Sequence, residues 1–240
     1  MNTPTINPSK LAQFSNIRLD DGAHNEGPRM CALEAVAWLT DEAWSDRPAC
    51  VSQVIGAFMR ALNDYWDDKQ RQQLKPYTLR VIGTAGDGQD AARSYLALDW
   101  MLRTYTPAWL DLAGLHEDAA ALRAHRQVVD EEAAESIRPI VEASRVHATV
   151  AWDAARHVAR SDAWENAGDT AAAATQGNTW GAACVAARAA AGAAARAAAW
   201  VVASVDAQVS AWDALAPTVD TLQTSSLALL DRMINPTAGA

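Results

Sequence analysis

The sequence contains only three cysteines among its 240 residues, and their spacing is irregular. An odd number of cysteines without a regular spacing does not make a disulfide framework. The N-terminal segment MNTPTINPSK also lacks the apolar stretch of a secretory signal peptide. Both absences favour a protein that works in a reducing cytoplasm, so we expect a cytoplasmic location.

The sequence also lacks an excess of positive charge, with a formal net charge of −9 at pH 7. Binding to nucleic acid or to anionic membranes needs a basic surface, so neither is an expected partner. One long alanine-rich run, residues 183–205, contains Arg188 and Arg196. Both arginines would be costly in the middle of a bilayer, and we therefore expect no membrane-spanning segment.

No stretch of the sequence alternates regularly between apolar and polar residues, which excludes an extensive β-sheet. Helical spacing is common instead, as in the row of Val51, Ile55, Phe58 and Leu62. We therefore predict an all-α fold, a multi-helix bundle with an alanine-rich C-terminal helical part. Residues 1–29 are expected to be mostly a loop or extended arm, with room for a short helix after Pro8. Helices are expected over residues 30–44, 51–66, 69–74, 89–105, 107–112 and 117–138.

Two prolines are expected to divide the C-terminal half. Pro139 should mark a kink or a junction, and Pro217 should start a new helix that forms a hairpin with the segment before it. We predict an N-terminal helical part, residues 1–139, and an alanine-rich helical bundle, residues 140–240. The two parts are either separate domains or one continuous domain.

Phenylalanine is scarce, with two residues, whereas tryptophan is abundant, with ten. Alanine dominates the second half and fills little core volume, so tryptophans should supply the missing bulk. Two rows with a spacing of four place large side chains along one helix face. The rows are Trp152, Arg156, Arg160 and Trp164, and then Trp180, Cys184, Arg188, Gly192, Arg196 and Trp200.

The arginines of these rows have two interpretations. In the architectural one, they stack on the tryptophan rings that fill gaps between helices. In the functional one, Arg156, Arg160, Arg188 and Arg196 line a groove for a phosphate-bearing ligand. The sequence favours the architectural interpretation.

Residues 22–64 hold the densest group of reactive side chains, namely His24, Cys31, Glu34, Asp46 and Cys50. Both cysteines come near the start of an expected helix, where the helix dipole lowers a thiol pKa. Three interpretations are open. One is a zinc site formed by His24, Cys31, Cys50 and Asp46, although no familiar zinc spacing is present. Another is a nucleophilic Cys31 with His24 as its base and Asp46 or Glu34 as the group that orients the base. The favoured one is structural, with buried cysteines and loops held by hydrogen bonds.

This block resembles a family of uncharacterised phage and actinobacterial proteins. The resemblance covers under a fifth of the chain, and it implies a phage or bacterial origin but no mechanism. The residues that carry it are Gly22, His24, Met30, Cys31, Glu34, Ser45, Asp46, Pro48, Cys50, Asn63 and Asp64.

Three functions therefore compete. The leading prediction is a non-enzymatic helical binding protein that engages a protein partner or associates with itself. It rests on a Val/Leu seam over residues 202–233, with Trp212, Leu215, Leu227, Leu230 and Ile234 as the expected outer face. The alternatives are a small hydrolase or zinc-dependent enzyme centred on His24, Cys31 and Asp46, and a module that sequesters a phosphate-bearing ligand.

Overall fold

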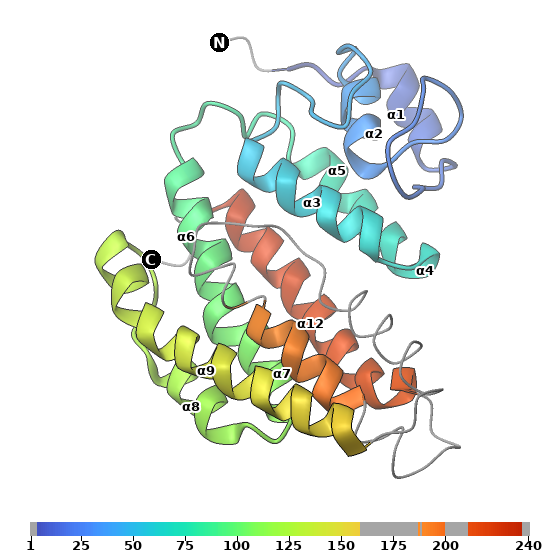
Figure 1. Ribbon diagram of the computed structural model, residues 1–240. Coiled ribbons are helices and arrows are strands. Elements are labelled where there is room, and N and C mark those ends of the chain that lie inside the picture. Colours follow the sequence, from blue (N-terminus) through green and yellow to red (C-terminus); the bar gives the residue numbers. More distant parts are fainter. Residues whose placement is uncertain (1–3, 159–186, 188, 200–210, 237–240) are drawn as a thin grey trace. The chain divides into compact units, whose positions relative to one another are not determined.

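The computed structural model describes residues 4–158, 187, 189–199 and 211–236 (Figure 1). These residues contain helices and no strand; a single isolated β-bridge joins Leu19 and Met30. The all-α, multi-helix prediction is thus confirmed. The chain forms two compact units, which we call the first unit (residues 1–94 and 232–240) and the second unit (residues 95–231).

The first unit is built from short helices. They are α1 (Pro8–Phe14), α2 (Ala32–Leu39), α3 (Gln53–Tyr65), α4 (Asp68–Arg71), the 3₁₀ turn η1 (Gln72–Leu74), α5 (Lys75–Arg80) and the start of α6 (Asp90–Trp100). Helix α2 packs against both α3 and α5. The apolar stripe of α3 supplies Ile55 and Met59 to a core that also contains Leu33, Val36 and Leu74, all fully buried.

Helix α1 closes the C-terminal end of α2. The Lys10 ammonium donates to the Trp38 carbonyl at 2.8 Å and forms an ion pair with Asp41. A cation at this end stabilises a helix because the last carbonyls carry partial negative charge. Asp41 adopts a φ of +57°, and α2 ends at Leu39, which is five residues before the end expected from the sequence.

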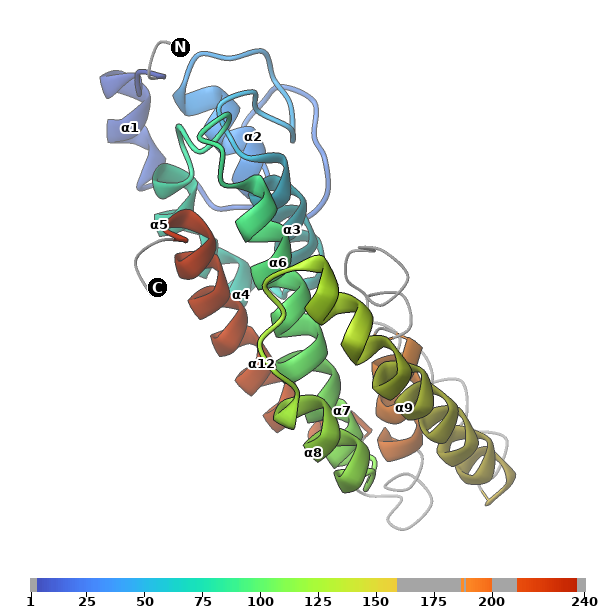
Figure 2. The same cartoon turned by 90° about the vertical axis from the view of Figure 1, so that its left-hand side faces the viewer.

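The second unit begins within a continuous helical run from residue 90 to residue 112. In this run, α6 passes through the π-helical segment η2 (Met101–Tyr105) into α7 (Thr106–Leu112). Helix α8 (His116–Ala124) then folds back and packs against both α7 and α9 (Glu131–Val158), as Figure 2 shows. Gly114, with a φ of +77°, makes the turn between α7 and α8.

Alanine forms much of the core of this unit. Residues 189–199 are helical, and alanines on almost every side of this helix are buried. Small side chains allow neighbouring helices to approach closely on all sides. The same core includes buried residues of α7, α9 and α12 (Ala211–Ile234), namely Trp109, Leu110, Ile137, Val141, Leu215 and Leu222.

Two expected helix boundaries are wrong, and at Pro139, where a kink or a junction was expected, the helix continues. The helix expected over residues 117–138 is split, because α8 ends at Ala124 and α9 begins at Glu131. Helix α9 then runs through Pro139, and α12 runs through Pro217, so the expected hairpin at Pro217 is absent. Each proline removes one backbone hydrogen bond, but both helices bury apolar side chains beyond it, which offsets the loss.

That residue 139 is the boundary between two domains stays a prediction. Pro139 itself lies inside α9, well within the second unit. Among the described residues, no helix is both long enough and apolar enough to cross a membrane.

Candidate functional site

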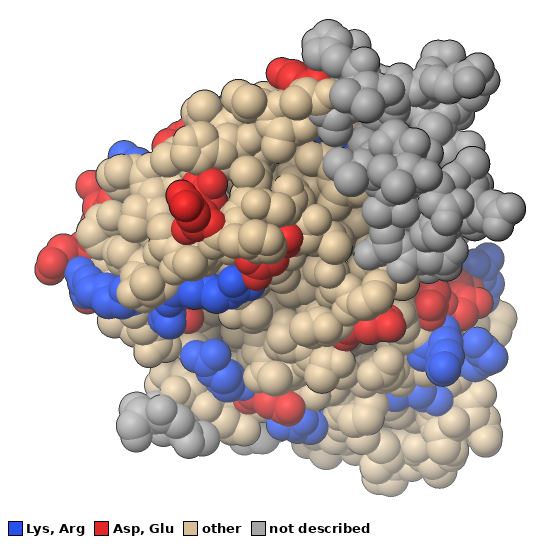
Figure 3. All heavy atoms as spheres, turned by 90° about the horizontal axis from the view of Figure 1, so that it is seen from below, with Lys and Arg blue, Asp and Glu red and all other residues tan. Residues whose placement is uncertain are grey.

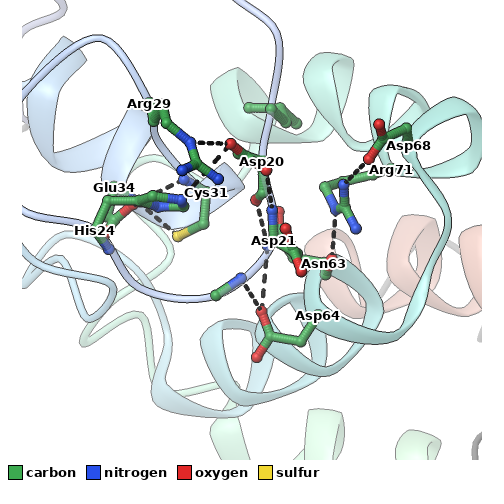
Figure 4. A network of polar contacts seen from close by, with 12 residues as sticks. Asp20, Asp21, His24, Arg29, Cys31, Glu34, Asn63, Asp64, Asp68 and Arg71 are labelled. Carbon is green, nitrogen blue, oxygen red and sulfur yellow. Dashed lines mark hydrogen bonds and ion pairs between the residues drawn. The ribbon is translucent and has the colours of Figure 1, made fainter.

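The Glu34 carboxylate is the centre of the polar network formed by the block of residues 22–64 (Figure 4). Glu34 is almost completely buried in the first turn of α2. Its Oε1 accepts the His24 backbone N–H at 2.5 Å, and its Oε2 accepts the Cys31 backbone N–H at 2.8 Å. The His24 ring also bonds to it, with Nδ1 at 2.9 Å from Oε2. One buried carboxylate therefore holds the loop to the helix.

These donors control the ionisation of Glu34. Burial by itself opposes the charged form, but the backbone N–H groups of His24 and Cys31 and the His24 ring outweigh it. The pKa of Glu34 consequently lies below its ordinary value. Glu34 is thus an ionised hydrogen-bond acceptor near neutral pH, which suits a structural role.

Cys31 is the N-cap of α2. Its sulfur accepts the Glu34 backbone N–H at 3.4 Å, while the Glu34 side chain bonds back to the Cys31 N–H, which completes a capping box. Burial raises the pKa of the Cys31 thiol to about 12. The expectation that the helix dipole would favour a thiolate is therefore wrong, because desolvation outweighs the dipole.

His24 is held on both sides of its ring. Its Nε2 lies 3.9 Å from Asp20 Oδ2, opposite the Glu34 contact, and the Trp44 indole donates to the His24 carbonyl at 2.7 Å. Asp20 in turn pairs with the Arg29 guanidinium. The ring thus lies between two carboxylates.

Asp46 and Cys50 bond to other partners. The Arg60 guanidinium lies 3.8 Å from the Asp46 carboxylate, and the buried Cys50 thiol faces Glu42. Burial and the Glu42 carboxylate raise the pKa of Cys50 to about 12. Within the described part of the chain, no three His, Cys, Asp or Glu side chains are arranged to hold a metal ion, so the zinc ligands suggested by the sequence are not assembled.

Asn63 extends the network to α3. Its Oδ1 accepts the Ala32 N–H at 3.0 Å, and its Nδ2 donates to the Asp20 carbonyl at 2.9 Å. The buried Arg71 donates to the carbonyls of Asn63 and Trp66. Sequence reasoning gave Arg71 no role, since nothing in its surroundings signals that a charged residue of a four-residue helix is buried.

The arginine rows are described only in part. Arg196 lies over the Trp152 ring, 5.3 Å from its centroid, and burial lowers the pKa of Arg196. This contact is of the kind that the architectural interpretation expects. The side chains of Arg156, Arg160 and Arg188, and those of Trp164, Trp180 and Trp200, lie outside the described residues.

Of the outer apolar face expected on α12, Leu215 and Leu230 are fully buried, Leu227 and Ile234 are partly buried, and the Trp212 side chain lies outside the described residues. Exposed apolar side chains occur on α9 instead. Val146 is 49% exposed and Val150 is 62% exposed, and they continue a row with the exposed Pro139 and Ala143. We call these four residues the α9 outer row.

The α9 outer row lies opposite the face by which α9 joins the core. Ala133, Ile137, Val141 and Ala148 of that inner face are completely buried. Helix α9 therefore carries apolar side chains on two opposite faces, and the described residues of the chain cover only one of them. The sequence did not single out this row, because apolar residues recur at helical spacing on both the inner and the outer face of α9 and the pattern does not show which face is buried.

In comparisons with known proteins, the chain matches no family model, no curated protein and no solved structure. The resemblance of residues 22–64 to phage and actinobacterial proteins therefore stays a prediction.

Proposed function

We propose that this protein is a non-enzymatic helical binding protein, and that it engages a protein partner through the α9 outer row. The observation that carries the proposal is the exposure of Val146 and Val150 on a long helix whose opposite face is already buried. Exposed valines four residues apart form a continuous apolar strip along one helix face. An apolar strip on one helix face is a surface on which a partner helix can pack.

The bonding of the block of residues 22–64 supports the non-enzymatic part of the proposal. A nucleophilic cysteine needs a lowered thiol pKa or a base that faces its sulfur. Burial raises the pKa of Cys31 to about 12, and the His24 ring bonds to Glu34. The block then serves to fix the loop of residues 20–30 on the first unit.

The proposal can be tested with the double variant Val146→Ser/Val150→Ser. A display library of helical peptides with unbiased charge is panned against the full chain, and affinities of the recovered peptides are measured for both proteins. Loss of two valine contacts should weaken binding by roughly tenfold or more. The melting temperature should hardly change, since both valines are already exposed to solvent.

Val129→Ser is the matched control. Val129 is 53% exposed but precedes α9 and is not part of the α9 outer row. Its substitution should leave peptide affinity unchanged. The proposal fails if panning yields no binder, or if the double variant binds every recovered peptide as tightly as the wild type does.

A further inference from the structure

We infer that the partner of the α9 outer row is a basic amphipathic helix, an inference that rests on the proposed function. The row follows the spacing of a helix–helix seam. Pro139, Ala143, Val146 and Val150 are separated by four, three and four residues. This alternation keeps side chains on one line facing a second helix. The row spans about 16 Å at ~1.5 Å per residue, which is enough for three turns of a partner.

Acidic side chains lie at the N-terminal end and along one flank of the row. On a helical projection at ~100° per residue, Glu132 continues the row toward the N-terminus of α9. Glu135, Glu142 and Asp153 follow one flank within roughly 80° of the row's centre. All four are exposed. A partner helix that packs on the row must therefore approach these carboxylates.

The described arginines of α9 lie farther from the row. Arg138 and Arg145 are rotated more than about 100° from its centre on the same projection. Each is also paired within α9, Arg145 with Glu142 at 2.7 Å and Arg138 with Glu135 at 4.0 Å, and Arg126, which precedes α9, pairs with Glu132 at 3.1 Å. The carboxylates therefore stand between the arginines and the row. In the view of Figure 3, acidic and basic side chains are interspersed over the surface, with wide uncharged areas between them.

Charge complementarity selects the partner. Lysines or arginines along the edge of an apolar helix face would meet these carboxylates, and such pairs increase both the association rate and the specificity. A second copy of this chain fits less well, because each copy carries a net charge of −9 and the copies repel each other.

Two synthetic helical peptides provide the probe. They share one leucine face that matches the row and differ only in the flanking residues, all lysine in one and all glutamate in the other. Fluorescence anisotropy with the full chain should show the lysine peptide binding at least roughly tenfold more tightly. Its affinity should fall as salt rises from about 50 mM to about 300 mM, because salt screens exposed charge pairs.

Two sets of variants separate a specific site from general attraction to an acidic protein. Glu135→Gln/Glu142→Gln should weaken the lysine peptide by roughly fivefold, whereas Asp21→Asn/Glu26→Gln should leave its affinity unchanged. Asp21 and Glu26 are exposed carboxylates of the first unit, and their replacement removes the same total charge. An equal loss for the two pairs would overturn the inference.

The remaining outcomes distinguish the inference from the proposed function. If both peptides bind equally and Val146→Ser/Val150→Ser abolishes both, the row binds helices and the basic partner is wrong. If this double variant changes neither affinity, the proposed function itself fails. Light scattering that shows a dimer disrupted by the double variant would assign the row to a second copy and overturn the basic-helix inference.

Discussion

At the scale of single residues, Glu34 is the residue that connects the parts of the candidate site. Its carboxylate joins the His24 loop, the Cys31 cap and the start of α2, and it is shielded from water. A buried acceptor with several N–H donors cannot be replaced without leaving a donor unpaired. The pattern of residues 22–64 indicated a local group, but it could not show that Glu34 rather than Cys31 is its centre.

Glu34→Gln should lower the free energy of unfolding by ~2–4 kcal/mol near neutral pH, because the amide turns an N–H toward a donor. Urea denaturation followed by circular dichroism measures the change. Exposed Glu26→Gln is the control, with an expected change within ~0.5 kcal/mol. Equal stability of the two variants would mean that the loop is not held by this carboxylate.

The lowered pKa of Glu34 also predicts how the stability lost in Glu34→Gln depends on pH. The folded-state pKa of Glu34 lies below its ordinary value of 4.5, so the ionised group stabilises the folded state above that pH. This contribution is lost as the pH falls through the lower, folded-state pKa. The stability difference between wild type and Glu34→Gln should therefore shrink as the pH is lowered below about 4.5. A difference that stays constant or grows in this range would contradict the assignment.

At the scale of helices, packing overrode local sequence rules. Proline usually ends a helix, yet α9 continues through Pro139 because Ile137 and Val141 are both anchored in the core. Glycine in a helix interior is likewise unfavourable, and Gly56 lies in the middle of α3. A side chain added at Gly56 would meet Arg60 Nη1 at 3.5 Å and Leu33 Cδ1 at 3.8 Å, which are ordinary contacts.

Gly56→Ala should therefore raise the free energy of unfolding by ~0.5–1 kcal/mol, since alanine restricts the unfolded chain and fits the folded one. Gly114→Ala is the opposite control, because Gly114 has a φ of +77° and alanine is strained there. We expect Gly114→Ala to lower stability by ~1–2 kcal/mol. Urea denaturation of both variants checks the signs, and a destabilised Gly56→Ala would show that α2 and α3 pack more closely than described.

At the scale of the whole molecule, Arg93 joins segments far apart in the chain. Its fully buried guanidinium forms an ion pair with Asp87 and donates to the Thr84 carbonyl at 3.1 Å and to the Met233 carbonyl at 2.9 Å. Residues 93 and 233 both belong to the first unit, so this side chain closes that unit around the end of α12. The Arg93 guanidinium is also what holds the pKa of Asp87 below its ordinary value.

Arg93→Met should destabilise the protein by ~3–5 kcal/mol, because it leaves Asp87 and two buried carbonyls without their donor. Arg93→Lys should rescue little of this loss, since an ammonium cannot reproduce the planar fork. Exposed Arg138→Met is the control and should change stability by less than ~0.5 kcal/mol. Hydrogen exchange of amides in α6 and in the last turn of α12 measures the effect, and unchanged protection in Arg93→Met would rule out this role.

The sequence by itself determined the helical class and the position of α3, and it indicated that residues 22–64 form a local group. These depend on periodicity and on contacts within a few tens of residues, which a local pattern records. Only the tertiary structure decided the high thiol pKa of Cys31, the burial of Arg93, and the exposure of Val146 and Val150 on α9. Each of these depends on which surfaces are removed from water, and desolvation is set by residues distant in the chain.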